Sequence, residues 1–100
     1  MVLNGHDHIY ERFAPQNEKG KLDPERGIRE FIAGTGGGGV YKFGKVAANS
    51  EIRDNTSYGV LKLTLSPGKY AWEFIPMAGS RFTDTGTASC SPVVRAAPGL

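Results

Sequence analysis

The chain of 100 residues is long enough for one small domain, and its composition excludes several classes of protein. The formal net charge is only +2 and the basic residues are scattered, so no nucleic-acid interface is predicted. No apolar stretch approaches the roughly 20 residues of a membrane-spanning helix, and the first residues lack the pattern of a signal peptide. With 14 glycines and 39% hydrophobic residues, the chain is expected to be rich in loops and strands. A lone cysteine, Cys90, cannot form an intrachain disulfide.

The first predicted element is the end of a buried strand at residues 2–4, and a histidine motif follows it directly. Gly5 removes a side chain where the backbone must turn or approach another group closely. His6 and His8 stand two residues apart, so on extended backbone both imidazoles point to the same side. Neutral imidazole is the commonest protein metal ligand, and open α/β sheets bind ligands at the carboxyl ends of strands. The spacing predicts a metal site, with an ordinary pair of loop histidines as the alternative.

The segments after this motif alternate between loops and one short strand. Residues 13–27 are polar and rich in turn residues, which predicts a surface loop. Residues 28–33 are expected to form a short strand inside a sheet, and this strand runs into the glycine-rich residues 34–39. Residues 40–55 are expected to form a second loop region.

The clearest prediction is an antiparallel hairpin at about residues 58–75. Its first strand carries leucines on one face and its second strand carries alternating aromatic residues: Leu61, Leu63, Leu65, Tyr70, Trp72 and Phe74. Residues 66–69 between the strands contain proline and glycine, which favour a tight turn. An isolated hairpin is marginally stable in water, so a second layer must cover its apolar face. Trp72 is expected to belong to the core.

The chain becomes polar after the hairpin, and no further strand is predicted there. We assign residues 1–88 to the domain and residues 89–100, which contain two prolines and little periodicity, to a flexible tail. No internal repeat is present.

The glycine-rich residues imitate two phosphate-binding motifs. Gly34, Gly36 and Gly39 fit the pattern Gly-x-Gly-x-x-Gly after a strand. However, residues 40–44 are a poor start for the helix whose N–H groups would hold a pyrophosphate. The related P-loop pattern fails because Val46 stands where a magnesium-binding Ser or Thr belongs. We therefore favour a loop beside a strand end over a nucleotide site.

The octet from Gly5 to Arg12 resembles the last metal-binding motif of the calcineurin-like metallophosphoesterases, and its Tyr-Glu-Arg extension is most similar to the purple acid phosphatases. Members of the family often carry a Gly-Thr-Gly-Gly segment, as residues 34–37 do here. The resemblance covers about residues 2–90. It implies an α+β, mostly β chain that forms the carboxyl-terminal part of a larger catalytic domain, a four-layer α/β/β/α sandwich.

The resemblance also implies a reaction. The family hydrolyses phosphate esters at two metal ions about 3.5–4 Å apart, with iron, zinc or manganese as candidates. His6 would bind the second ion and His8 the first. The other ligands belong to upstream motifs that this chain lacks, so the fragment by itself is expected to be inactive. Because members of this branch are commonly exported, a secreted or periplasmic protein is expected, with a phosphate ester and the upstream part of the domain as partners.

Four neighbours of the histidines are candidates for a supporting role. Asp7 is expected to point away from the imidazoles and to act outside the ligand set. Tyr10, Glu11 and Arg12 could orient the ligands through hydrogen bonds, or Glu11 and Arg12 could form an internal ion pair. Two other functions stay open: a stand-alone β-rich binding or structural module, and a mononuclear metal site completed by carboxylates such as Asp7.

Overall fold

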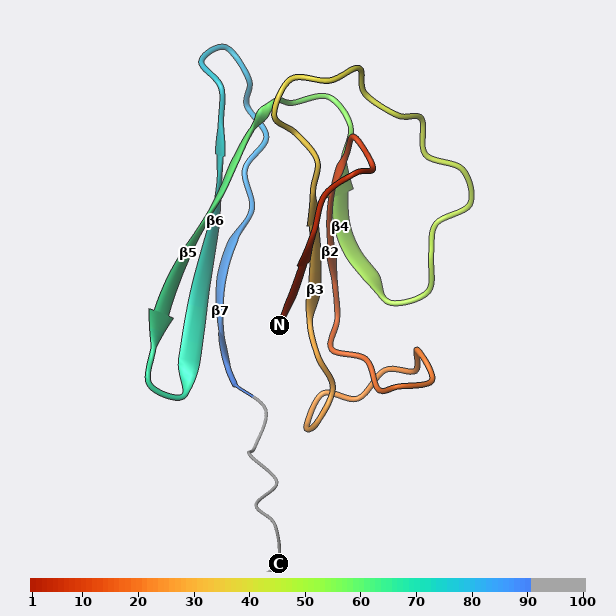
Figure 1. The fold of residues 1–100 in the computed structure, drawn as a ribbon, viewed down its shortest axis with the longest axis vertical. Helices are drawn as coiled ribbons and strands as arrows, with labels where there is room; N and C mark the ends of the chain where they lie inside the picture. The colour runs from red at the N-terminus through yellow and green to blue at the C-terminus, as the bar shows by residue number, and fades with distance from the viewer. Residues whose placement is uncertain (91–100) are drawn as a thin grey trace, which may run out of the picture.

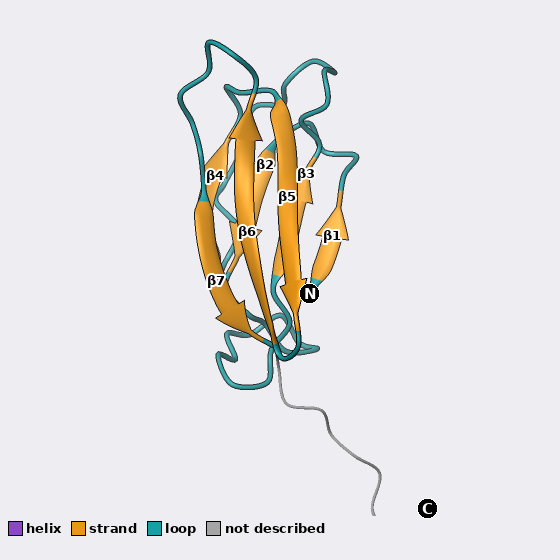
Figure 2. Cartoon of the chain, turned by 90° about the vertical axis from the view of Figure 1, so that its left-hand side faces the viewer, coloured by secondary structure: helices purple, strands orange, loops and turns teal. Residues whose placement is uncertain are grey.

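The computed structural model describes residues 1–90, which form two packed β-sheets and contain no helix (Figure 1). The strands are β1 (Val2–Asn4), β2 (Tyr10–Phe13), β3 (Glu30–Ala33), β4 (Ser50–Asp54), β5 (Gly59–Ser66), β6 (Lys69–Pro76) and β7 (Thr85–Ser89). One sheet has the order β1-β3-β2-β4 and the other the order β5-β6-β7. Figure 2 shows the second sheet lying in front of the first. Over the described range, no helix capable of crossing a membrane is found.

The first sheet brings two loops together at one edge. β1 and β3 run parallel, whereas all other paired strands run antiparallel. Parallel strands end at the same edge of a sheet, so the segments that follow β1 and β3 are neighbours at the top of Figure 1. These segments are residues 5–9, which contain both histidines, and residues 34–49, which begin with the glycine-rich loop. The predicted position of the histidines at a strand's carboxyl end is confirmed.

The predicted hairpin is confirmed as β5 and β6. Leu61 lies opposite Phe74 and Leu63 opposite Trp72, so the leucines and aromatic residues share the face that packs on the first sheet. Gly68 has a φ of 74°, which explains the glycine in the turn. Leu65 departs from the prediction because it lies next to the turn of the hairpin, where 69% of its surface is exposed.

The core between the sheets is mainly aromatic. Its buried residues are Tyr10, Phe31, Tyr70, Trp72 and Phe74. The Trp72 ring fits against β7 because Gly86 lacks a side chain there: a Cβ at Gly86 would lie 2.3 Å from the ring. The guanidinium carbons of Arg12 and Arg29 lie 5.1 and 5.0 Å from the centre of the Trp72 ring. Such contacts between cations and an aromatic face are favourable. The burial of Trp72 confirms it as a core residue.

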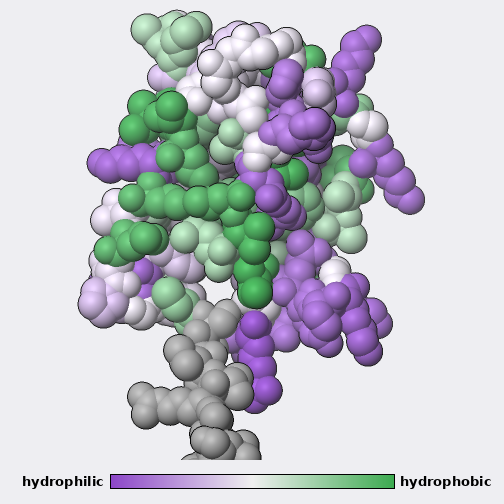
Figure 3. Space-filling model, in the orientation of Figure 1, coloured by the Kyte–Doolittle hydropathy of each residue, from purple (hydrophilic) through white to green (hydrophobic). Residues whose placement is uncertain are grey.

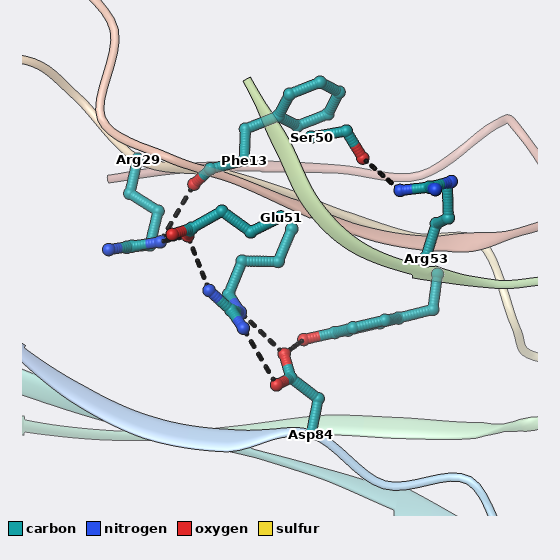
Figure 4. A network of polar contacts seen from close by, with 8 residues as sticks. Phe13, Arg29, Ser50, Glu51, Arg53 and Asp84 are labelled. Atoms are coloured by element: carbon teal, nitrogen blue, oxygen red, sulfur yellow. Dashed lines mark hydrogen bonds and ion pairs between the residues drawn. The ribbon is translucent and has the colours of Figure 1, made fainter. Parts of the chain in front are cut away.

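A polar network crosses the core and joins the two sheets (Figure 4). Asp84, which directly precedes β7, is buried, and its carboxylate accepts hydrogen bonds from three donors. Tyr10 Oη donates to Oδ2 over 2.6 Å, and Arg12 donates to Oδ2 over 2.8 Å and to Oδ1 over 3.1 Å. A bidentate contact between Arg and a carboxylate is among the strongest protein hydrogen bonds.

A β-bulge supplies a second carboxylate to this network. The register between β2 and β4 shifts between Arg12 and Phe13, so Glu51 has no partner in the ladder. The Glu51 carboxylate accepts hydrogen bonds from Arg12, over 2.6 Å, and from Arg29. Both guanidinium groups that flank Trp72 are therefore also held by Glu51.

The network shifts the pKa of two of its members. Burial raises the pKa of Tyr10, and the hydrogen bond to Asp84 and the charge of Asp84 raise it further. Burial lowers the pKa of Arg12, but the hydrogen bonds and charge of Asp84, with a contribution from Glu51, outweigh burial and raise it overall. Tyr10 is therefore held neutral and Arg12 charged.

The structure differs from the expected secondary structure in several segments. β4 is a short ordered segment within the loop region expected at residues 40–55, and β7 lies in the polar part of the chain where no strand was predicted. Ser89, the first residue of the predicted tail, is the last residue of β7. Residues 91–100 of the predicted tail lie outside the described residues. The expectation of an α+β, mostly β chain is confirmed for the β content, whereas the described residues contain no helix.

The strand β1 is present as predicted but is not buried. It forms an edge of the first sheet, and Val2 and Leu3 expose 42% and 53% of their surface. Figure 3 shows hydrophobic side chains collected on the face that carries β1 and β5.

Tyr10→Phe is expected to change how stability depends on pH. The folded chain keeps the Tyr10 proton above the pKa of about 10 at which an unfolded chain releases it, so wild-type stability falls as pH rises above 10. The loss attributable to Tyr10 approaches about 1.4 kcal/mol per pH unit and is absent in the variant. Urea unfolding at pH 8 to 11 measures it, and equal slopes for both proteins would contradict the prediction.

Candidate metal site at the ends of β1 and β3

The backbone around the two histidines is bent rather than extended. His6 has a φ of 72°, in the left-handed region that non-glycine residues rarely adopt. Two tight backbone hydrogen bonds hold the bend, from Asp7 N to Gly5 O over 2.9 Å and from Ile9 N to Asp7 O over 2.8 Å. The expected extended His-x-His geometry, which would direct both imidazoles to one side, is therefore wrong.

The close approach that was expected at Gly5 occurs at Gly34 instead. A Cβ at Gly5 would meet open space, and the φ of Gly5 is not positive. A Cβ at Gly34 would lie 1.9 Å from the carbonyl oxygen of Asp7, and Gly34 N donates to Ile9 O over 3.0 Å. Gly34, which directly follows β3, thus allows the histidine bend to pack directly on the neighbouring backbone.

The imidazole of His8 is half-buried and is held on two sides. Its Nδ1 lies 2.5 Å from the carbonyl oxygen of Gly39, and its ring lies 4.6 Å from the ring of Tyr41 at an interplanar angle of 30°. A carbonyl oxygen can only accept a hydrogen bond, so Nδ1 must carry the proton. In the neutral ring Nε2 is then the nitrogen with a free lone pair, which is the form that binds a metal ion.

His6 is exposed, and its imidazole is the second candidate ligand. Within residues 1–90, no group of three or more His, Cys, Asp or Glu side chains is arranged to hold a metal ion. A catalytic metal needs about three protein ligands and an open position. The donor chemistry of the two imidazoles fits a transition metal, but the described residues supply only part of a ligand set.

The residues that were expected to support the histidines have other contacts. Asp7 is exposed. Tyr10 and Arg12 bond to Asp84 inside the core, and Arg12 pairs with Asp84 and Glu51 rather than with Glu11. The buried Glu11 carboxylate accepts a hydrogen bond from Ser50 Oγ over 2.6 Å. The second half of the octet is therefore anchored in the sheet.

Neither nucleotide motif has the structure that it requires. Residues 40–49 contain no helix, so no helix N-terminus follows the glycines to hold a phosphate. The glycine-rich loop instead packs against His8, and sequence reasoning did not single out three residues that contribute to this packing: Gly38, Tyr41 and Asn55. The sequence signal for this packing is the glycine run at residues 34–39. The contact of that run with His8 appears only in the structure.

Comparisons with protein families, with curated proteins and with solved structures found no match for this chain.

His6→Gly is expected to stabilise the fold although it deletes a candidate ligand. A left-handed conformation costs a non-glycine residue about 1 kcal/mol, and glycine adopts it without this penalty. The free energy of unfolding of His6→Gly, measured in urea, should exceed that of His6→Ala by about 1 kcal/mol. Equal stabilities, or a more stable alanine variant, would show that His6 is not strained.

Proposed function

We propose that this chain belongs to a metal-dependent hydrolase of phosphate esters, similar to the purple acid phosphatases, and that it supplies His6 and His8 to a dinuclear site. The observation that supports this most is the hydrogen bond from His8 Nδ1 to Gly39 O. Metal-binding histidines commonly donate their second ring N–H to a backbone carbonyl, which fixes the tautomer and directs the other nitrogen to the ion.

The backbone of His6 gives independent support. Residues held in rare backbone conformations cluster at functional sites, where the surrounding structure maintains the strain. His6 is one of two non-glycine residues with positive φ in the described range, the other being Asn49. His6 is exposed and lies two residues from the anchored His8. Its strained backbone therefore supports a functional role for its imidazole.

The exposed strand β1 supports a larger catalytic domain. Parallel strands are usually covered on both faces, yet β1 pairs in parallel with β3 and exposes Val2 and Leu3. We propose that the upstream part of the domain covers this strand and brings the remaining metal ligands. The two packed sheets described here would then be the inner layers of the four-layer α/β/β/α sandwich.

In this arrangement the residues of this chain would hold the metal ions and orient the ligands that bind them. His6 and His8 would bind one ion each through imidazole nitrogen, and Gly39 O keeps the proton of His8 on Nδ1. Bound iron, zinc or manganese ions would neutralise the charge of the phosphate group. The ion pair between Arg12 and Asp84 holds β2, which anchors the second half of the octet directly after the bend that carries the histidines.

One observation favours the alternative of a binding module. An open groove of about 1170 Å³ lies at the far end of the sandwich from the histidines. Exposed apolar side chains line it, among them Leu22, Ile28 and Leu65. Such a groove can hold a ligand without any metal.

Substitution of each histidine separates these functions. In the longest reading frame that contains this chain, His6→Ala and His8→Ala should each lose bound metal and lower phosphate-ester turnover by roughly 100-fold or more, because ligands matter at least as much as their supporting groups. Elemental analysis and a phosphatase assay measure the two effects, and Lys45→Ala in the exposed loop is the control.

The outcomes differ among the three candidate functions. Full metal content and turnover in both histidine variants would eliminate the phosphatase and favour the binding module. A mononuclear site completed by Asp7 instead predicts that Asp7→Asn releases the metal as completely as either histidine substitution.

A further inference from the structure

We propose that residues 34–41, here called the glycine clamp, fix the tautomer and orientation of His8 so that Nε2 is the nitrogen offered to a transition-metal cation. The inference deepens the proposed function and depends on it for the identity of the ligand. It assigns a positioning role to Gly38, Gly39 and Tyr41.

Both ends of the glycine clamp are anchored to other elements. Near its start, the buried Thr35 donates from Oγ1 to Gly59 O over 2.9 Å, and its own carbonyl accepts from Gly59 N over 3.0 Å. At its end, Tyr41 O accepts from Asn55 Nδ2 over 2.9 Å, and Tyr41 N donates to His8 O over 3.2 Å. The loop is thus tied to β5, to the link between β4 and β5, and to the histidine bend.

Between these anchors the clamp surrounds the imidazole. Gly39 O lies at Nδ1, and the Tyr41 ring packs on the imidazole. The backbone of Gly38 passes so close that a Cβ there would lie 2.6 Å from Cε1, 2.8 Å from Nδ1 and 3.1 Å from Nε2 of His8. Even one added methyl group would displace the ring.

The other clamp glycines do not have this constraint. A Cβ at Gly36 or Gly39 would meet nothing within 4 Å, and neither residue has a positive φ. The φ of Gly38 is not positive either, so Gly38→Ala adds a clash with His8 without adding backbone strain. Gly36→Ala is therefore a matched control within the same loop.

As a consequence of these contacts, the His8 imidazole is ordered before a cation binds. A free imidazole exchanges between two neutral tautomers and several ring orientations, and binding must select one of them. The glycine clamp fixes one tautomer and one ring orientation of His8 before binding. The lone pair that this leaves on Nε2 suits zinc, iron or manganese.

The first test is the tautomer of His8 in the metal-free chain, read from long-range ¹H–¹⁵N NMR spectra of the imidazole. The wild-type chain and Gly36→Ala should carry the proton on Nδ1. Gly38→Ala should show a mixture of tautomers or the Nε2-protonated form, while the amide resonances of β5 and β6 show that the fold is intact. Should Gly38→Ala fail to fold, Tyr41→Ala removes the stacking ring and should loosen His8 in the same way.

The second test is Co²⁺ binding, measured by titration of the same three chains. Gly38→Ala should bind Co²⁺ roughly tenfold more weakly than wild type, and Gly36→Ala should bind it equally well. Two results would contradict the positioning role of the glycine clamp without contradicting the proposed function. One is an Nε2-protonated His8 in the wild-type chain, and the other is identical behaviour of Gly38→Ala and Gly36→Ala in both tests. A fixed Nδ1 tautomer in a chain whose Co²⁺ binding is unaffected by His8→Ala would overturn the proposed function instead.

Discussion

The buried contact between Arg12 and Asp84 is the constraint on which the rest of the structure depends. It joins β2 of the first sheet to the segment before β7 of the second, and Tyr10 binds the same carboxylate. Loss of one partner from a buried ion pair costs roughly 3–5 kcal/mol, because the other charge stays behind without compensation. Arg12 also packs on Trp72. The contacts of Arg12 with Asp84 and with Trp72 therefore both hold β2 against the second sheet.

This constraint divides the octet into two parts with different tasks. Tyr10 and Arg12 are held in the core, and Glu11 is bonded to Ser50. The preceding residues leave the sheet in a strained bend that carries His6 and His8 to the edge where β1 and β3 both end. The glycine-rich loop from β3 then packs against His8. The strand β2, the strained bend and the close-packed loop together fix the imidazole of His8 and the backbone of His6.

The sequence predicted those parts of the fold that local patterns determine. The hairpin was predictable because large apolar residues alternate on both strands and Pro67-Gly68 favours the turn. β4 and β7 were missed because their residues are small or polar, and they depend on pairing with distant strands and, in β7, on the fit of Gly86 to Trp72. The positive φ of His6 and the contact of Gly38 with His8, thirty residues away, leave no local pattern.

The most direct test of the account is to locate a paramagnetic ion on the folded chain. Co²⁺ titrated into the ¹⁵N-labelled protein broadens and shifts the resonances nearest to the bound ion. We expect the strongest effects at the imidazoles of His6 and His8 and at the amides of residues 38–41. Strongest effects at the pocket lined by Glu18, Asp23 and Glu30, with the histidine resonances unchanged, would contradict a metal site at the ends of β1 and β3.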